Sequence, residues 1–327
     1  MIFSIKSKSV FNKIAIELFC LQAKKNSVYK KYIRQININP EKVKSIIEIP
    51  FLPIEFFKSH KITTNPKLFT KLFLSSGTTG TERSKHYVAD ISLYEKSFRK
   101  CFELFYGDIK QYTILAILPS YYKNKNSSLL YMINDLIYRS KKKESGFYLD
   151  SDNKKLVDII QKILSENKKV ILFGVPSALL KMSASFTNSL TNSLGQKFIV
   201  METGGMKSRS EEIIREELHK TLCEKFGVNK IHSEYGMTEL FSQSYSQGDG
   251  LFYCPPWMKI FVRDVNDPFQ ILPYGKTGAI NIIDLANIHS CSFIATQDLG
   301  KIYENGSFEV HGRMDNSDLR GCNLMIE

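Results

Sequence analysis

Short apolar runs alternate with amphipathic stretches through the middle of the chain. The apolar runs at 112–118, 169–173 and 198–201 are bounded by proline or glycine, which is typical of buried strands. Helical periodicity marks the stretches at 90–105, 127–138, 152–164 and 208–226, and the last opens on Ser208 and Glu211 with capping-box spacing. This alternation predicts an α/β body, in which helices cover the faces of a sheet.

The two ends of the chain have different patterns. Residues 9–35 have helical periodicity, and 49–57 combines two prolines with several aromatic residues, which predicts an extended arm packed on the body. After about residue 251 the helices give way to expected strands at 258–263, 279–283, 291–296 and 308–311. We therefore expect a helical segment and arm over 1–70, an α/β body over 71–250 and a β-rich subdomain over 251–327.

Composition and charge narrow the class of protein. Of the 327 residues, 43% are hydrophobic and 24% are charged, which is ordinary for a globular protein. The net charge of +12 favours an acidic partner such as a nucleotide, a nucleic acid, an anionic carrier protein or a membrane surface. The densest basic runs, around Lys123 and Lys141, flank loops and indicate solvated surface, so we expect no nucleic acid partner.

The cysteines and the hydrophobic runs bear on the compartment. Six cysteines are scattered without a CxxC pair or zinc-ligand spacing, and no secretory segment precedes them, so we expect reduced thiols and a cytoplasmic protein. Cys20, Cys101 and Cys223 have the spacing of helix-core residues. No apolar run is long enough to span a bilayer, so no membrane span is expected.

A glycine- and hydroxyl-rich loop is the first candidate for chemistry. It lies between two short apolar stretches, 72–74 and 86–88, has Lys85 behind it, and consists of Ser75, Ser76, Gly77, Thr78, Thr79 and Gly80. Closely spaced backbone N–H groups, hydroxyls and a cation are the groups that surround a polyphosphate. Taken alone, the same composition also describes an ordinary loop.

Two further motifs follow the loop in sequence. The first spans 232–239 and contains Tyr235, Gly236, Thr238 and Glu239, which are suited to stacking on a purine, binding phosphate and holding Mg²⁺. The second contains Asp298 and Arg313 and leads to Arg320, Gly321 and Cys322. A carboxylate at a strand end can accept both ribose hydroxyls, and an arginine can pair with phosphate. Each motif alone also has a structural interpretation: a turn carboxylate, a surface arginine or a packed tyrosine.

Together and in this order, the three motifs resemble those of the adenylate-forming superfamily, which includes acyl-CoA synthetases. The arm Pro-Phe-Leu-Pro-Ile-Glu-Phe-Phe-Lys, the segment Asn126–Leu130 and the Arg-Gly-Cys ending narrow the resemblance to the LuxE-type acyl-protein synthetases. The resemblance implies an adenylate-forming-type large domain with a β-rich C-terminal subdomain. It also implies that the chain, which stops at Glu327, lacks most of the usual small C-terminal domain and its adenylation lysine.

The resemblance further implies the chemistry. A fatty acid or other carboxylic acid would react with ATP, the phosphate loop and Lys85 would stabilise the phosphates, and Glu239 would hold Mg²⁺. Tyr235 with Gly204 and Gly205 would bind adenine, Asp298 the ribose, and Arg313 the ribose–phosphate edge. Cys322 is the candidate thiol for a thioester, which a reductase or carrier protein would accept.

Two alternatives share these residues. One is an acyl- or aryl-CoA ligase of the phenylacetate–CoA ligase type, and the other is a degenerate adenylating fold that only binds or carries an acyl group. His86 and His232 lie beside the motifs, but a packed or surface histidine is the more common interpretation of each.

Overall fold

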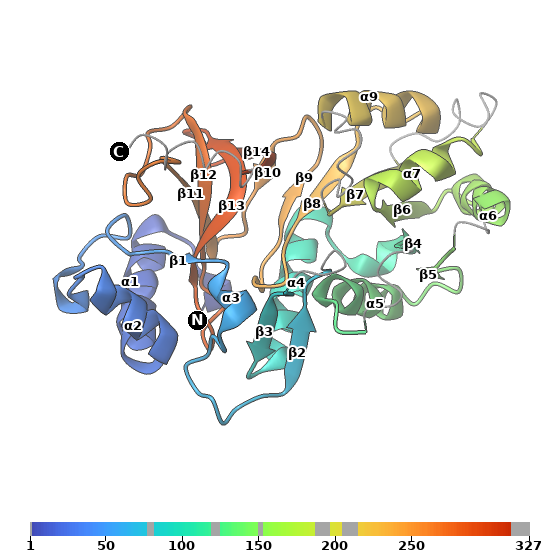
Figure 1. The fold of residues 1–327 in the computed structure, drawn as a ribbon. Coiled ribbons are helices and arrows are strands. Elements are labelled where there is room, and N and C mark those ends of the chain that lie inside the picture. Colours follow the sequence, from blue (N-terminus) through green and yellow to red (C-terminus); the bar gives the residue numbers. More distant parts are fainter. Residues whose placement is uncertain are drawn as a thin grey trace. The chain divides into compact units, whose positions relative to one another are not determined.

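In the computed structural model of the protein, the described residues are 2–76, 82–118, 125–149, 153–186, 197–204 and 215–314. The chain divides into two compact units (Figure 1). The central unit is Lys67–Pro255, and the terminal unit combines Met1–Pro66 with Pro256–Glu327. The expected boundaries at 70 and 250 lie near these limits, but the grouping of the two ends of the chain into one unit was not predicted.

The central unit contains the alternating elements. In chain order they are β2 (Lys71–Leu74), β3 (Lys85–Val88), α4 (Ile91–Tyr106), η3 (Ile109–Gln111), β4 (Tyr112–Ile117), α5 (Ser128–Ser140), β5 (Gly146–Phe147), α6 (Asn153–Ser165), β6 (Lys169–Gly174), α7 (Pro176–Ser183), β7 (Phe198–Thr203), α9 (Arg215–Phe226), β8 (His232–Tyr235), β9 (Ser244–Ser246) and β10 (Phe252–Tyr253).

Its main sheet has the strand order β5-β4-β6-β7-β8-β9-β10. The strands from β5 to β8 are parallel, whereas β9 and β10 continue the sheet antiparallel. Every residue of β4 is buried, because helices cover both faces of the parallel strands. Figure 1 shows α7 and α9 on one side of these strands and α4 and α5 on the other. The predicted α/β body is confirmed.

The core on the α7–α9 side follows from the strand period of two. Alternate apolar residues of β4, β6 and β7 pack against α6, α7 and α9, and these residues are Leu115, Ile117, Val170, Leu172, Phe198 and Val200. The predicted helices are confirmed within a few residues at each described end. The capping box at Ser208 and Glu211 lies outside the described residues.

The terminal unit contains η1 (Ile2–Ser4), α1 (Lys8–Lys25), α2 (Ser27–Gln35), η2 (Pro40–Lys42), β1 (Leu52–Pro53), α3 (Phe56–Ser59), β11 (Met258–Arg263), β12 (Thr277–Asp284), β13 (Phe293–Ile302) and β14 (Phe308–Arg313). The last four strands form an antiparallel sheet in sequence order, and β1 pairs parallel with β13. The β-rich character expected after residue 251 is therefore confirmed.

The helix predicted over 9–35 is broken at Asn26. Its backbone is extended, and its side chain accepts hydrogen bonds from the N–H groups of Val28 and Tyr29, which starts α2. Asn26 Nδ2 also donates to Ser290 O at 3.0 Å, and Gln22 Nε2 donates to Asn287 O at 2.9 Å. These buried bonds tie the first helices to the loop between β12 and β13, which explains why both ends of the chain belong to one unit.

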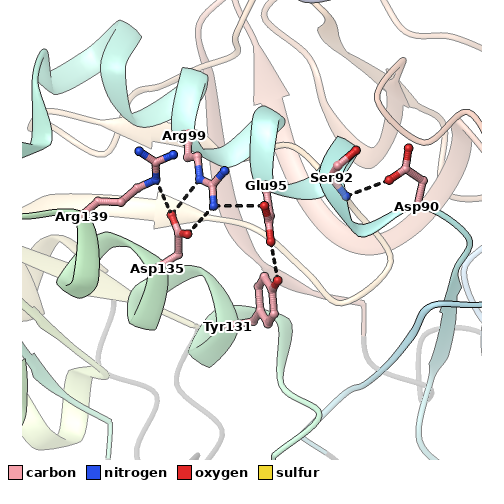
Figure 2. Close-up of polar contacts among 7 residues, drawn as sticks. All are labelled: Asp90, Ser92, Glu95, Arg99, Tyr131, Asp135 and Arg139. Carbon is pink, nitrogen blue, oxygen red and sulfur yellow. Dashed lines mark hydrogen bonds and ion pairs between the residues drawn. The ribbon is translucent and has the colours of Figure 1, made fainter.

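A charged network joins α4 to α5 (Figure 2). The carboxylate of Asp135 accepts from Arg99 Nε at 2.9 Å and from a second nitrogen of the same guanidinium, and it lies 3.2 Å from Arg139 Nε. Arg99 also pairs with Glu95, which accepts from the hydroxyl of Tyr131. Because only 16% of the Asp135 side chain is exposed, solvent screens this network less than a fully exposed pair.

We expect Asp135→Asn to lower the free energy of unfolding by about 1–2 kcal/mol, since the substitution removes the charge that two arginines share. Urea denaturation followed by circular dichroism measures the change. Asp158→Asn, on the exposed face of α6, is the matched control and should change stability by less than about 0.5 kcal/mol. Equal stability of both variants would show that the network contributes nothing.

Candidate functional site

The candidate phosphate loop is carried by the β2–β3 hairpin. These antiparallel strands pair Leu74 with Lys85, and two bonds extend the pairing by one step. Ser75 N donates to Ser84 O at 3.1 Å, and Ser84 N donates to Ser75 Oγ at 3.0 Å. The strand–loop–strand expectation is therefore confirmed. Ser76 is half-buried, and Gly77, Thr78, Thr79 and Gly80 lie outside the described residues.

His86 links this hairpin to the second motif. Its ring is buried, stacks on Phe241 with ring centroids 5.0 Å apart, and places Nδ1 2.8 Å from the carbonyl oxygen of Thr238. A carbonyl only accepts, so Nδ1 carries the hydrogen. Burial lowers the pKa of His86 to about 4, more than the bond to Thr238 raises it, and the ring is neutral at physiological pH. This packed histidine brings the strand that carries Lys85 together with the Tyr-Gly-Met-Thr-Glu segment.

The second motif begins on β8 and continues into a turn. The Tyr235 ring is buried and packs edge-on against Phe252, with centroids 5.9 Å apart. Gly236 follows, and a Cβ at this position would require the Glu234 carboxylate to shift. In the turn that follows, Thr238 is half-exposed and Glu239 is buried.

Two carboxylates lie at the ends of adjacent parallel strands. Glu202 on β7 is paired in register with Ser233, and Glu234 on β8 with Thr203, so the two side chains project from opposite faces of the sheet. The hydroxyl of Thr203 donates to Glu234. Burial raises the pKa of Glu234 to about 7, and the charge of Glu202 adds to this, whereas the bond from Thr203 lowers it.

The pKa of Glu202 is shifted in the opposite direction. Burial would raise its pKa, but His219 and Arg215 on α9 outweigh that effect and lower it. Arg215 Nε lies 3.4 Å from Glu202 Oε1, and its guanidinium lies 5.3 Å from the ring centroid of Phe252. A continuous set of contacts thus joins Glu202 through Arg215 and Phe252 to Tyr235.

Gly204 and Gly205 follow β7. Gly204 has φ +72°, a left-handed conformation that favours glycine. Gly205 lies outside the described residues.

The third motif lies in the terminal unit. Asp298 is paired in register with Arg313 on β14, and Arg313 Nε donates to Asp298 Oδ1 at 3.2 Å. The Asp298 side chain is 10% exposed, whereas that of Arg313 is 75% exposed. Asp298 also lies where β13 changes its edge partner: Ile294 and Ala295 pair with β1, and the residues from Asp298 onward pair with β14.

A comparison with protein families decides the relationship. The family described as "Acyl-protein synthetase, LuxE" matches residues 2–327. The chain belongs to this family. A comparison with curated protein sequences gives no match.

Solved structures show the fold of this LuxE-family chain. ATP-bound MatB from Rhodopseudomonas palustris is 20% identical with a TM-score of 0.54 over 74% of this chain and 47% of MatB. A 2-hydroxyisobutyryl-CoA ligase in complex with 2-HIB-AMP is 13% identical with a TM-score of 0.70 over 94% of this chain and 68% of the ligase. The chain spans about half the length of MatB. The predicted adenylate-forming α/β fold is confirmed.

Several groups in the LuxE-family chain were not found from its sequence. Glu202, Glu234 and Arg215 have ordinary local patterns, and only the strand register shows that the carboxylates occupy adjacent strand ends. His232 is packed, as its more common interpretation suggested: it lies 3.1 Å from the hydroxyl of Tyr106, and burial lowers its pKa to about 4. Arg263, which donates to the backbone of Thr296 close to Asp298, was also missed.

The cysteines give a mixed result. Cys101 is buried and Cys223 half-buried, but Cys20 is exposed, so its assignment to the helix core was wrong. It lies on the outward side of α1, next to the buried Phe19. Cys322 lies outside the described residues.

Among the described residues, no three His, Cys, Asp or Glu side chains gather as a metal site. No described helix is both long and apolar enough to cross a bilayer.

We expect the stability of Glu234→Gln to exceed that of the parent chain increasingly as pH rises from about 4.5 to about 7. Folding raises the pKa of Glu234 from 4.5 to about 7, so the folded state holds a proton that the unfolded state has lost in this window. The parent should therefore lose about 3 kcal/mol relative to the variant, since one pKa unit corresponds to about 1.4 kcal/mol. Urea denaturation of both proteins at pH 4.5 and pH 8 measures the difference.

The difference in stability between the parent and the glutamine variant reports the titration of Glu234 without the contribution of the histidines. His86 and His232 have lowered pKa values, so they contribute the opposite slope, but equally in both proteins. A stability difference that does not vary with pH would show that folding does not raise the pKa of Glu234.

Proposed function

We propose that the protein activates a carboxylic acid, with a long-chain fatty acid as the expected substrate, by reaction with ATP and transfers the acyl group to a cysteine thiol. The observation that carries the proposal is the match to the acyl-protein synthetase family over residues 2–327. The solved structures of the same fold include ATP-bound MatB and a ligase holding 2-HIB-AMP.

In the first step, a carboxylate oxygen attacks the α-phosphorus of ATP. A new C–O–P linkage forms, the bond to the bridging oxygen of the β-phosphate breaks, and pyrophosphate leaves, giving acyl-AMP. The phosphate loop would stabilise the phosphate charge through Lys85 and its hydroxyls. The β2–β3 pairing and the neutral His86 support this assignment, because they hold the loop ends and the Thr238 backbone in one arrangement.

Four residues are assigned to recognition of the nucleoside. Tyr235 would stack on adenine beside Gly204. Gly204 has a left-handed backbone, and because it is a glycine it has no Cβ that would obstruct the ring. Asp298 would accept the ribose hydroxyls, and Arg313, which already donates to Asp298, would lie near the ribose–phosphate edge. A mostly buried carboxylate is suited to this task, since its hydrogen bonds are little weakened by solvent.

The donor set also fits Mg²⁺ bound together with the nucleotide. Mg²⁺ commonly takes one or two carboxylates with substrate phosphates and water, so the single buried Glu239 suffices without a further cluster of protein ligands. The ion would neutralise charge on the phosphate oxygens.

In the second step, a thiolate attacks the acyl carbonyl carbon, AMP leaves, and the thiol proton is lost to solvent. Cys322 is the proposed nucleophile, because a thiolate is both a strong nucleophile and a good leaving group for onward transfer. A reductase or carrier protein would then accept the acyl group. The acyl-CoA ligase is the second candidate, since the similar 2-hydroxyisobutyryl-CoA ligase has also been solved with CoA.

We expect pyrophosphate release that requires both Mg²⁺-ATP and a carboxylic acid. We also expect Asp298→Asn to raise the KM for ATP about tenfold or more, because hydrogen bonds to a charged acceptor are lost. A coupled pyrophosphate assay with a panel of labelled acids measures both. Asp267→Asn, at an exposed position of the same unit, is the matched control and should keep the parent KM. Pyrophosphate release independent of any acid would contradict acyl-adenylate formation.

We expect labelled acyl-protein to form in the parent chain and to be released by neutral hydroxylamine, as a thioester is. Cys322→Ser should lose this adduct and keep acid-dependent pyrophosphate release, whereas the exposed-cysteine control Cys20→Ser should keep both. Intact mass measurement checks the adduct. A hydroxylamine-sensitive adduct on Cys322→Ser would eliminate Cys322, and free acyl-CoA without any adduct would favour the CoA ligase.

A further inference from the structure

The Thr-Gln-Asp segment of β13 forms a bulge. In the pairing of β12 with β13, Ala279 is opposite Leu299 and Asn281 is opposite Ala295. One residue of β12, Ile280, therefore faces the three residues 296–298 of β13. A bulge of this kind removes backbone groups from the ladder and redirects the side chains on the bulged strand.

Arg263, a buried residue of β11, supplies donors to this bulge. Its guanidinium donates through Nη1 to Ile280 O at 3.0 Å and through Nη2 to Thr296 O at 2.7 Å. Nη1 also donates to Asn281 Oδ1 at 2.7 Å. One side chain thus bonds the backbone of both strands at the point where their ladder is interrupted.

Thr296 completes the arrangement. Its hydroxyl donates to Ile280 O at 2.8 Å and accepts from the N–H of Asp298 at 3.1 Å. The carbonyl of Ile280 therefore receives both the guanidinium and the hydroxyl, and the backbone of Asp298 is bonded to a residue that Arg263 also holds. The chain of contacts from Arg263 to Asp298 contains one intermediate residue.

The chemistry of the side chain explains why arginine occupies this position. Buried backbone carbonyls that lose their ladder partner need another donor, because an unsatisfied buried polar group costs free energy. The rigid planar fork of a guanidinium reaches two carbonyls on different strands at once, whereas the single ammonium of lysine is a flexible point charge. Burying a cation is itself costly, and the three hydrogen bonds that the guanidinium makes at the bulge offset this cost.

We propose that Arg263 is a positioning residue for nucleotide recognition: by bonding the Thr296–Asp298 bulge, it sets the direction of the Asp298 carboxylate toward the ribose hydroxyls. This role rests on the proposed function. It makes Arg263 responsible for selectivity between ribose and deoxyribose, although Arg263 itself does not touch the nucleotide.

The test compares ATP with 2′-deoxyATP and 3′-deoxyATP in acid-dependent pyrophosphate release. The measured quantity is the ratio of kcat/KM for ATP to that for each deoxynucleotide. Arg263→Lys keeps the charge but loses the fork, and we expect it to lower the ratio by about five- to tenfold through KM, which is the size of one weakened hydrogen bond to a charged group. Asp298→Asn sets the lower limit of the ratio.

The ratio separates positioning from a general loss of folded protein. A variant that only destabilised the fold would lose active molecules, so the rates with all three nucleotides would fall equally and the ratio would be unchanged. Arg34→Gln, at an exposed position on α2 of the same unit, is the matched control and should keep the parent ratio. If Arg263→Lys does not fold, Thr296→Val takes its place with the same two readings.

Each outcome either supports or overturns the proposed role of Arg263. A lowered ratio in Arg263→Lys with an unchanged ratio in Arg34→Gln supports the proposal. An active parent whose discrimination persists in Arg263→Lys overturns it while leaving the proposed function in place. A ratio that Asp298→Asn does not lower overturns it together with the ribose role of Asp298, and leaves acid activation in place. A parent without acid-dependent pyrophosphate release removes the proposed function and this role together.

Discussion

The β13 strand has to satisfy backbone groups that its bulge takes out of the ladder, and the terminal unit is arranged around this constraint. Arg263 donates to carbonyls on β12 and β13, and Thr296 closes the remaining bonds. The same stretch is where β13 exchanges β1 for β14 as its edge partner. A long strand that changes partners at a bulge presents one side chain, Asp298, at the interruption. The position of Asp298 therefore depends on the hydrogen bonds that satisfy the backbone of the bulge, and not on loop geometry.

The central unit meets a related requirement with neutral groups. His86 is buried without charge, and its Nδ1 hydrogen satisfies the carbonyl of Thr238. At the adjacent strand ends, the pKa values of two carboxylates move apart: His219 and Arg215 lower that of Glu202, whereas burial and the charge of Glu202 raise that of Glu234. The pKa values of these two glutamates shift in opposite directions because each side chain faces a different layer of the fold and therefore has different neighbours.

The order of secondary structure was largely predictable. Strands β4, β6 and β7 are buried on both faces and read as continuous apolar runs, and α4 and α5 have clear helical periodicity. Some short elements were missed. Ser244–Ser246 forms β9 although two of its three residues are serines, because pairing with β8 and burial override weak strand propensity. The break at Asn26 was also missed: its side chain caps the second helix and bonds Ser290, a residue far along the chain.

The class of fold, the family and the types of residue available for chemistry could be predicted from the amino-acid sequence, since periodicity and local motifs depend on neighbours in the chain. It identified Lys85, Tyr235, Glu239 and Asp298 as candidates, and their strands or turns lie where the patterns indicated. Three features became visible only in the folded chain: its two ends form one unit, His86 bonds Thr238, and Arg263 bonds the bulge before Asp298. Those contacts join residues tens of positions apart or more, and their strength comes from burial, which no local pattern specifies.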